Sequence, residues 1–230
     1  MHVHLPKPLH GWREFLGEVG VIVIGVLLAL GADQLVERTT WRKHVAEAKE
    51  DLRGELQADL FNAQERVRME SCIDRRLDQL EQIIDRPPAQ AWKLLAGHGI
   101  VPIRVWTTSG WDSAVAADTV THMRAKERMQ YAGVYAFVRT LNELARDEFA
   151  VAVEFRMLER GGPLSEVTQD RLRADVARVR GYNHVFALGG TQISTLIRAL
   201  GVELTPEDRE VLADMKCPMP ADTLPGAALR

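Results

Sequence analysis

The feature that most constrains this chain is the apolar stretch at residues 15–36, FLGEVGVIVIGVLLALGADQLV, because no other stretch of the sequence is lipid-soluble. Its uncharged run covers residues 19–32, which is about 21 Å of α-helix at 1.5 Å per residue. The hydrocarbon core of a bilayer needs about 20 residues of helix. A helix here spans a membrane only if Glu18 and Asp33 lie at the two interfaces.

Tryptophan residues flank the apolar run on both sides. Along a continuous helix, Trp12 and Trp41 are about 43 Å apart. This separation matches a bilayer with its headgroup layers, where tryptophan concentrates. We therefore predict a transmembrane helix over residues 12–38, with Trp12, Glu18, Asp33 and Trp41 at the membrane interfaces.

Two other interpretations of the apolar stretch compete with an anchor. Ala29 and Gly31 supply the small residues of a signal-peptide cleavage site, which would leave an exported soluble protein. An apolar helix can also be buried inside a soluble domain. The helical pattern continues past Gly31 without turn residues, which favours an uncleaved single-pass anchor in a bacterial inner membrane.

The partners expected for such an anchor are membrane components. Gly25 and Ala29 form a small-xxx-small pair, a spacing that lets two membrane helices pack closely. The expected partners are therefore the lipid bilayer and either a second copy of the chain or another membrane protein.

The orientation of the span is ambiguous from local charge. Positive side chains concentrate in cytoplasmic loops, and more of them follow the span than precede it: Lys7 and Arg13 before, then Arg38, Arg42, Lys43 and Lys49 after. This count favours a cytoplasmic C-terminal domain.

Composition limits the remaining possibilities. The chain has 230 residues and a formal net charge of −3, so the near-neutral balance gives no indication of a nucleic-acid surface. Without the anchor, roughly 195 residues remain, enough for one domain. Cys72 and Cys217 could form one disulfide if the domain lies outside the cytoplasm. The sequence favours the other interpretation, in which the two cysteines are unrelated free thiols.

Beyond the span, the sequence is strongly periodic in apolar residues. Residues 41–86 carry apolar side chains at three-and-four spacing with charges between them, and Pro87 and Pro88 end the pattern. This predicts a long helix that could be continuous with the membrane helix. A coiled coil or a bundle helix explains such spacing, and a bundle is favoured.

The remaining elements are also helical. Candidate helices lie at residues 89–97, 121–159, 165–200 and 206–215, with an extended, irregular segment near residues 100–106. The pair Gly189 and Gly190 could kink the helix at 165–200 or let another backbone come close.

These elements give an all-α fold. We predict an antiparallel helical bundle of about four long helices with a short irregular Trp-rich segment. The predicted domains are a flexible tail at 1–11, the transmembrane helix, a bundle at 39–215 and a disordered tail at 216–230.

The Trp-rich segment contains the candidate ligand or partner surface: Trp92, Trp106 and Trp111. Aromatic side chains on irregular segments often line pockets or interfaces. The competing interpretation, favoured here, is that these rings close one end of the bundle as part of its core.

Motifs for chemistry are absent from the sequence. It contains no G-x-S-x-G, GxxxxGK[ST], CxxC or H-E-x-x-H pattern, and no Glu lies three residues before any of the seven histidines. We therefore expect no enzymatic activity, no catalytic or metal-binding residues and no cofactor.

The segments GEVGVIVIGVLLAL and WRKHVAEAKEDLRGELQADL together resemble an uncharacterised family of bacterial membrane proteins. The matching features are the Gly17-Glu18 start, the internal Ile24-Gly25 and the long charged helix, over residues 12–85. The family has no assigned activity. The resemblance implies an inner-membrane anchor with a periplasmic domain, although this chain departs from the more basic N-terminal tail of that family.

We adopt the periplasmic orientation and predict a membrane-anchored helical bundle that acts as a binding or scaffold component. The alternatives are a small-ligand sensor that uses the Trp-rich segment, and an exported soluble protein.

Overall fold

The computed structural model describes residues 11–85, 101–160 and 163–217. Several predictions concern segments outside these ranges. They are the flexible tail before Gly11, the short helix at 89–97 with Trp92, and the tail at 216–230 beyond Cys217.

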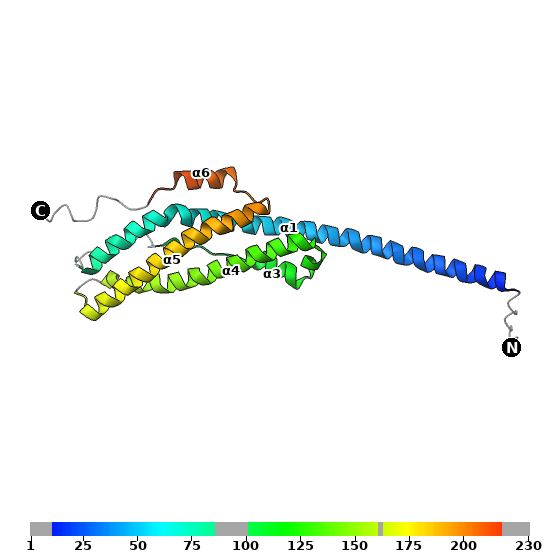
Figure 1. The fold of residues 1–230 in the computed structure, drawn as a ribbon, viewed down its shortest axis with the longest axis horizontal. Helices are drawn as coiled ribbons and strands as arrows, with labels where there is room; N and C mark the ends of the chain where they lie inside the picture. Colours follow the sequence, from blue (N-terminus) through cyan, green and yellow to red (C-terminus); the bar gives the residue numbers. More distant parts are fainter. Residues whose placement is uncertain (1–10, 86–100, 161–162, 218–230) are drawn as a thin grey trace.

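A single unbroken helix organises the fold. Helix α1 (Trp12–Asp85) has 74 residues. Its length is about 110 Å at 1.5 Å per residue. Its first part projects alone from the rest of the molecule, and its second part packs against the other helices (Figure 1). The prediction that the apolar stretch continues into the long charged helix is confirmed.

The all-α fold class is confirmed in the described residues. The elements after α1 are α3 (Ser109–Ala116), the 3₁₀ turn η1 (Thr119–His122), α4 (Ala125–Glu154), the 3₁₀ turn η2 (Phe155–Arg160), α5 (Glu166–Ala199) and α6 (Pro206–Asp214). Three of the described helices are long, namely α1, α4 and α5, where the sequence predicted about four.

The three long helices do not alternate in direction along the chain. Helix α5 runs antiparallel to α1 and α4, whereas α1 and α4 run in the same direction (Figure 1). Residues 102–108 contain no regular secondary structure and return the chain along α1. An extended chain covers about 3.3 Å per residue, twice the rise of a helix, so residues 104–110 pass the stretch of α1 from Glu65 to Glu55.

The core is built from the apolar face that the periodicity predicted on α1. Leu52, Leu56, Leu60 and Ala63 are fully buried and belong to one cluster with side chains from α3, α4 and α5. A second cluster lies farther along α1, around Leu77, and includes residues of α5 and η2. The long charged helix is thus a bundle helix.

The glycine pair of α5 lies where this helix packs tightly against its neighbours. Helix α5 continues through Gly189 and Gly190. A Cβ atom on Gly190 would lie 2.7 Å from the carbonyl oxygen of Ala63 on α1, well inside van der Waals contact. Of the two roles predicted for this pair, close backbone approach is the one observed.

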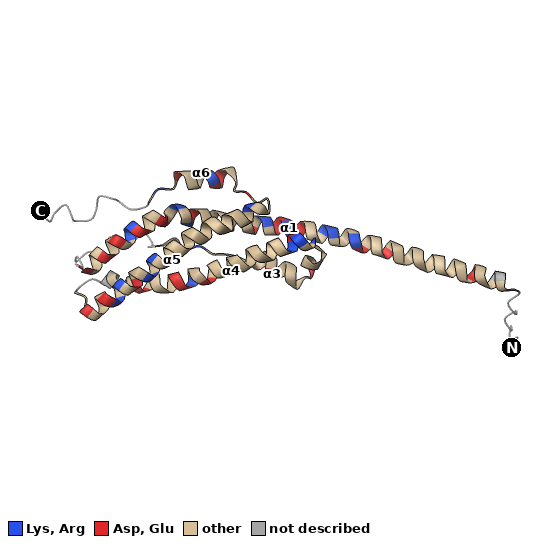
Figure 2. Cartoon of the chain, in the orientation of Figure 1, with Lys and Arg blue, Asp and Glu red and all other residues tan. Residues whose placement is uncertain are grey.

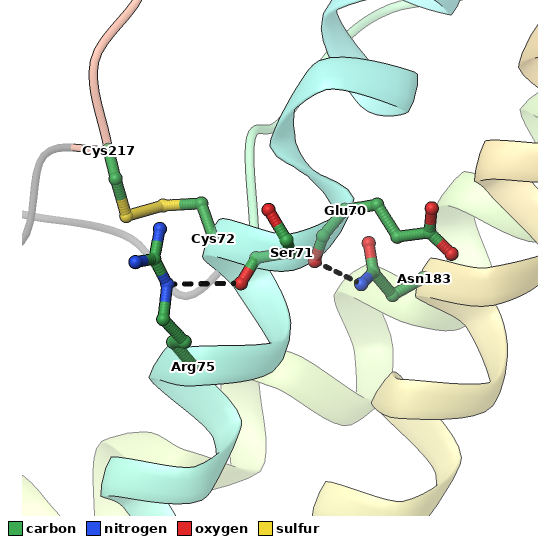
Figure 3. Close-up of a disulfide and its surroundings, with 6 residues drawn as sticks. All are labelled: Glu70, Ser71, Cys72, Arg75, Asn183 and Cys217. Carbon is green, nitrogen blue, oxygen red and sulfur yellow. Dashed lines mark hydrogen bonds between the residues drawn. A yellow bond between two sulfur atoms is a disulfide. The ribbon is translucent and has the colours of Figure 1, made fainter.

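A disulfide joins the end of the described chain to the C-terminal part of α1. Cys72 and Cys217 are bonded, with a sequence separation of 145 residues (Figure 3). The preference for two unrelated thiols was therefore wrong, because the chain after α6 returns to α1 and sequence spacing does not reveal this. In the chain-entropy description, closing a loop of this length stabilises the fold by about 5 kcal/mol.

Substitution of the α5 glycines tests the close approach. We expect Gly190→Ala to lower the free energy of unfolding by about 1–3 kcal/mol, because the methyl group must displace the α1 backbone. Urea denaturation of the full chain in detergent, followed by circular dichroism, measures this change.

Gly181→Ala is the matched control on the same helix, since nothing lies within 4 Å of its Cβ position. It should raise the free energy of unfolding by about 0.5–1 kcal/mol, because alanine loses less backbone entropy on folding. Equal stabilisation by both substitutions would contradict the tight α1–α5 contact.

Candidate functional site

The projecting part of α1 exposes apolar side chains on all sides. It is the one helix in the described residues that is long and apolar enough to cross a membrane, and none of its most apolar window is buried. Ile22 is 65% exposed and Leu28 is 69% exposed, although both are large aliphatic residues. An uncovered apolar helix of this size needs a lipid or protein surrounding.

Charge is arranged along α1 as an interface would require. The projecting stretch is nearly free of charged residues, and Lys and Arg become frequent just before the bundle begins (Figure 2). Glu18 and Asp33, the two acids predicted at the interfaces, are both exposed.

The two tryptophans predicted at the membrane interfaces have different surroundings. Trp12 is 74% exposed and its ring centroid lies 6.0 Å from that of Phe15. Trp41 is half-buried and stacks on His122, with 3.7 Å between ring centroids and 12° between ring planes. Trp41 is therefore also a contact between α1 and the bundle.

The tryptophans of the irregular segment pack inside the bundle. Trp106 is 3% exposed and stacks on Phe186, while Trp111 is 6% exposed and stacks on Tyr131 and Tyr135. Core aromatic rings cover both side chains, so the structure places Trp106 and Trp111 in the core of the bundle. Trp92, the third member of the candidate surface, lies outside the described residues.

A row of polar side chains on α1 holds the segment that carries these tryptophans. The side chains are spaced three or four residues apart, so they share one face of the helix. They contact successive groups of the returning segment. Glu65 accepts a hydrogen bond from Arg104 (2.6 Å), and the Asn62 amide donates to the Val105 carbonyl (3.1 Å). Asp59 accepts from the Thr107 N–H (3.4 Å), and Glu55 accepts from the Gly110 N–H (2.9 Å).

The surroundings of one member of this row, Asp59, disfavour the charged form of its carboxyl group. Its side chain is fully buried, and burial raises the pKa of the carboxyl group to about 7, with a further increase from the negative charge of Glu55. The hydrogen bond from the Thr107 N–H opposes this rise. Asp59 Oδ2 and the nearby Tyr135 hydroxyl both lack a hydrogen bond of normal geometry among the described residues.

A second polar group lies deeper in the bundle. The Arg66 guanidinium donates two hydrogen bonds to the Glu148 carboxylate, at 3.0 and 2.8 Å, and both side chains are buried. The guanidinium also lies over the Phe186 ring, 4.3 Å from its centroid. On the adjacent turns, the Asn183 amide donates to the Glu70 carbonyl at 2.9 Å (Figure 3). These contacts fix α1, α4 and α5 relative to one another.

The described surface contains a hollow where the projecting helix meets the bundle. Its volume is about 520 Å³. It is lined on one side by α1 from Glu37 to Lys49, and on the other by η1 and the start of α4. Trp41 and His122 form the contact between the two sides.

Basic side chains predominate in this hollow. Arg38, Arg42, Lys49 and Arg124 line it, together with the acids Glu37 and Glu127. Lys49 pairs with Glu127 at 2.6 Å.

The three arginines of the hollow are not paired in this way. Among the described residues, no ion pair joins Arg38, Arg42 or Arg124 to a carboxylate, and all three are exposed. These guanidinium groups are therefore available to an anion.

Sequence reasoning found Trp41 but missed the hollow. Its two sides come from segments about 80 residues apart, and His122 falls in a short turn without a motif. Only the charge cluster after the span (Arg38, Arg42, Lys43 and Lys49) was visible locally, and it was weighed as evidence on orientation alone.

Comparison of the chain with protein-family models, curated protein sequences and solved structures finds no match.

The buried carboxyl group of Asp59 predicts a pH-dependent stability. The folded chain keeps a proton that the unfolded chain releases near pH 4, so the free energy of unfolding should fall as pH rises from about 4 to 7 and then level off. The difference between the pKa of about 7 in the folded chain and that of an unfolded aspartate corresponds to about 4 kcal/mol of unfolding free energy. Asp59→Asn keeps the acceptor for the Thr107 N–H and should flatten this part of the profile.

Urea denaturation at a series of pH values measures both profiles. Asp51→Asn, an exposed carboxyl on the same helix, is the control and should retain the profile of the parent chain. Identical profiles for the parent and Asp59→Asn would refute this assignment.

Proposed function

We propose that this chain is a single-pass membrane protein whose α1 helix anchors a helical bundle beside the bilayer. The observation that carries this proposal is the fully exposed apolar half of α1, which is continuous with the buried half. A helix exposed on every side to water would be costly at about 25 cal/mol per Å² of apolar surface. A bilayer removes that cost without any further element of the chain.

The proposed role is that of a binding or scaffold component of an inner-membrane assembly. Continuity of α1 supports this role, because an unbroken helix fixes the distance and direction of the bundle relative to the span. The long polar sides of α4 and α5, with charged residues of both signs (Figure 2), offer a surface for a protein partner.

We further propose that the bundle lies on the periplasmic side of a bacterial inner membrane. The disulfide between Cys72 and Cys217 supports this orientation, since disulfides persist in oxidising compartments and are rare in the cytosol. It outweighs the positive-inside count, which compares a few side chains on either side of the span.

Charged substitutions in the span test the anchor. We expect the parent chain, expressed in a bacterial host, to remain in the membrane pellet after alkaline carbonate extraction. Ile24→Asp combined with Leu28→Asp should release the chain to the supernatant, because each charge at the centre of a span costs about 2.5–3.5 kcal/mol. Fractionation followed by immunoblotting measures the outcome.

The control places the same charges on exposed apolar positions of the bundle, Val167→Asp with Val211→Asp, and should leave the chain in the pellet. Intact-mass measurement accompanies the fractionation. A soluble parent chain whose mature N-terminus is Ala32 would overturn the anchor and establish an exported soluble protein.

Thiol labelling tests the orientation. We expect both cysteines to resist alkylation in cells lysed directly into an alkylating reagent, and both to react after reduction, because an oxidising compartment keeps them bonded. Mass shifts of the intact chain count the labelled thiols. Complete alkylation of Cys72 and Cys217 under denaturing conditions without reduction would place the bundle in the cytoplasm.

A further inference from the structure

We propose that the hollow between α1 and the start of α4 is a binding site for a phosphate group, supplied in the membrane by the headgroup of an anionic phospholipid. The lipid source rests on the proposed membrane anchor. The phosphate chemistry rests on the side chains of the hollow alone. Four observations converge on this site.

The first observation is the unpaired positive charge. Arg38, Arg42 and Arg124 line the hollow and form no ion pair with a carboxylate in the described part of the chain. They come from both sides of the hollow, so a single anion can contact α1 and the bundle together. Guanidinium groups donate paired hydrogen bonds whose geometry matches phosphate oxygens.

The second observation is the direction of α4. This helix of 30 residues begins at Ala125, and no side chain caps its N-terminus. The helix therefore begins beside Arg124, which lines the hollow, and Glu127 in its first turn is paired with Lys49. Unsatisfied N–H groups at a helix start favour an anion.

The third observation is the depth expected for the hollow. The hydrocarbon segment ends at the interface predicted at Asp33, and Arg38 lies about 8 Å farther along the helix. The headgroup layer is about 5–8 Å deep on each side, so Arg38 lies at the level of the lipid phosphates. Arg42 lies about 14 Å beyond Asp33, and a long arginine side chain extends back toward that level.

The fourth observation is the stacked pair that joins the two sides. Trp41 and His122 lie face to face at 3.7 Å, and Trp41 also contacts His44 edge-on at 5.6 Å. This pair gives the hollow an aromatic wall beside its charged groups. A wall of this kind suits the glycerol backbone of a lipid, because the interfacial layer is where tryptophan is most favourable.

Binding is tested with the full chain in a non-ionic detergent. Three probes are compared: phosphatidylglycerol, diacylglycerol with the same acyl chains but no phosphate, and inorganic phosphate. Native mass spectrometry measures lipid retained by the protein. Isothermal titration calorimetry measures inorganic phosphate. We expect phosphatidylglycerol to be retained at least tenfold more strongly than diacylglycerol.

The decisive variant is Arg42→Gln with Arg124→Gln, which should reduce phosphatidylglycerol retention about tenfold. Both side chains are exposed, so circular dichroism should show an unchanged fold. The matched control is Arg53→Gln with Arg146→Gln, exposed arginines of α1 and α4 outside the hollow. This control should bind as the parent chain does.

The outcomes separate the sources of the phosphate. Variant-sensitive retention of phosphatidylglycerol alone supports a lipid headgroup. Variant-sensitive binding of inorganic phosphate as well supports a site for soluble phosphate-bearing ligands. Equal retention of both lipids, or equal loss in the decisive variant and the control, overturns the proposal.

The test is also separable from the test of the anchor. The decisive variant leaves the span intact and should stay in the membrane pellet, so failure of lipid binding does not remove the anchor. If fractionation shows a soluble chain, the inorganic phosphate measurement still tests the hollow.

Discussion

The structure depends on the continuity of one helix. Helix α1 carries an apolar part that no other element of the described residues covers, and a part whose leucines form the core of the bundle. No turn or glycine-rich break separates these halves, so backbone hydrogen bonds couple the orientation of the exposed part to that of the packed part. The hollow lies at the junction of these two parts. There η1 and α4 begin beside the point where α1 leaves the bundle, and Trp41 contacts His122.

Polar groups inside the bundle give it one specific arrangement at a cost in stability. The Arg66–Glu148 pair is almost completely removed from water, and burial raises the pKa of Glu148 even though Arg66 opposes this. Replacement of such a pair by apolar residues is often neutral or stabilising. Its two directional hydrogen bonds are satisfied in the observed register of α1 and α4. The row from Glu55 to Glu65 acts in the same way on the returning segment, since each side chain matches one group of that segment.

Much of the fold was predictable from the sequence, because helix periodicity and caps are local signals. The start of α6 is an example: the helix predicted at 206–215 begins at Pro206, and Thr205 before it accepts a hydrogen bond from the Asp208 N–H and completes a capping box. The long-range features were not predictable. The disulfide, the parallel course of α1 and α4 and the contact of Gly190 with Ala63 each join segments more than 40 residues apart. Buried tryptophans were anticipated, but not the acids of α1 that hold their segment.

The orientation problem and the hollow are connected through the same arginines. Arg38 and Arg42 follow the span and were counted as positive-inside signals, which favour retention on the cytoplasmic side. In the structure these side chains line a hollow with Arg124 of the bundle, a residue more than 80 positions away. The placement of these arginines in the hollow gives them a role in the fold beside their effect on topology. Without them, the two sides of the span carry equal numbers of Lys and Arg (Lys7 and Arg13 before, Lys43 and Lys49 after), so the proposed periplasmic orientation rests on the disulfide.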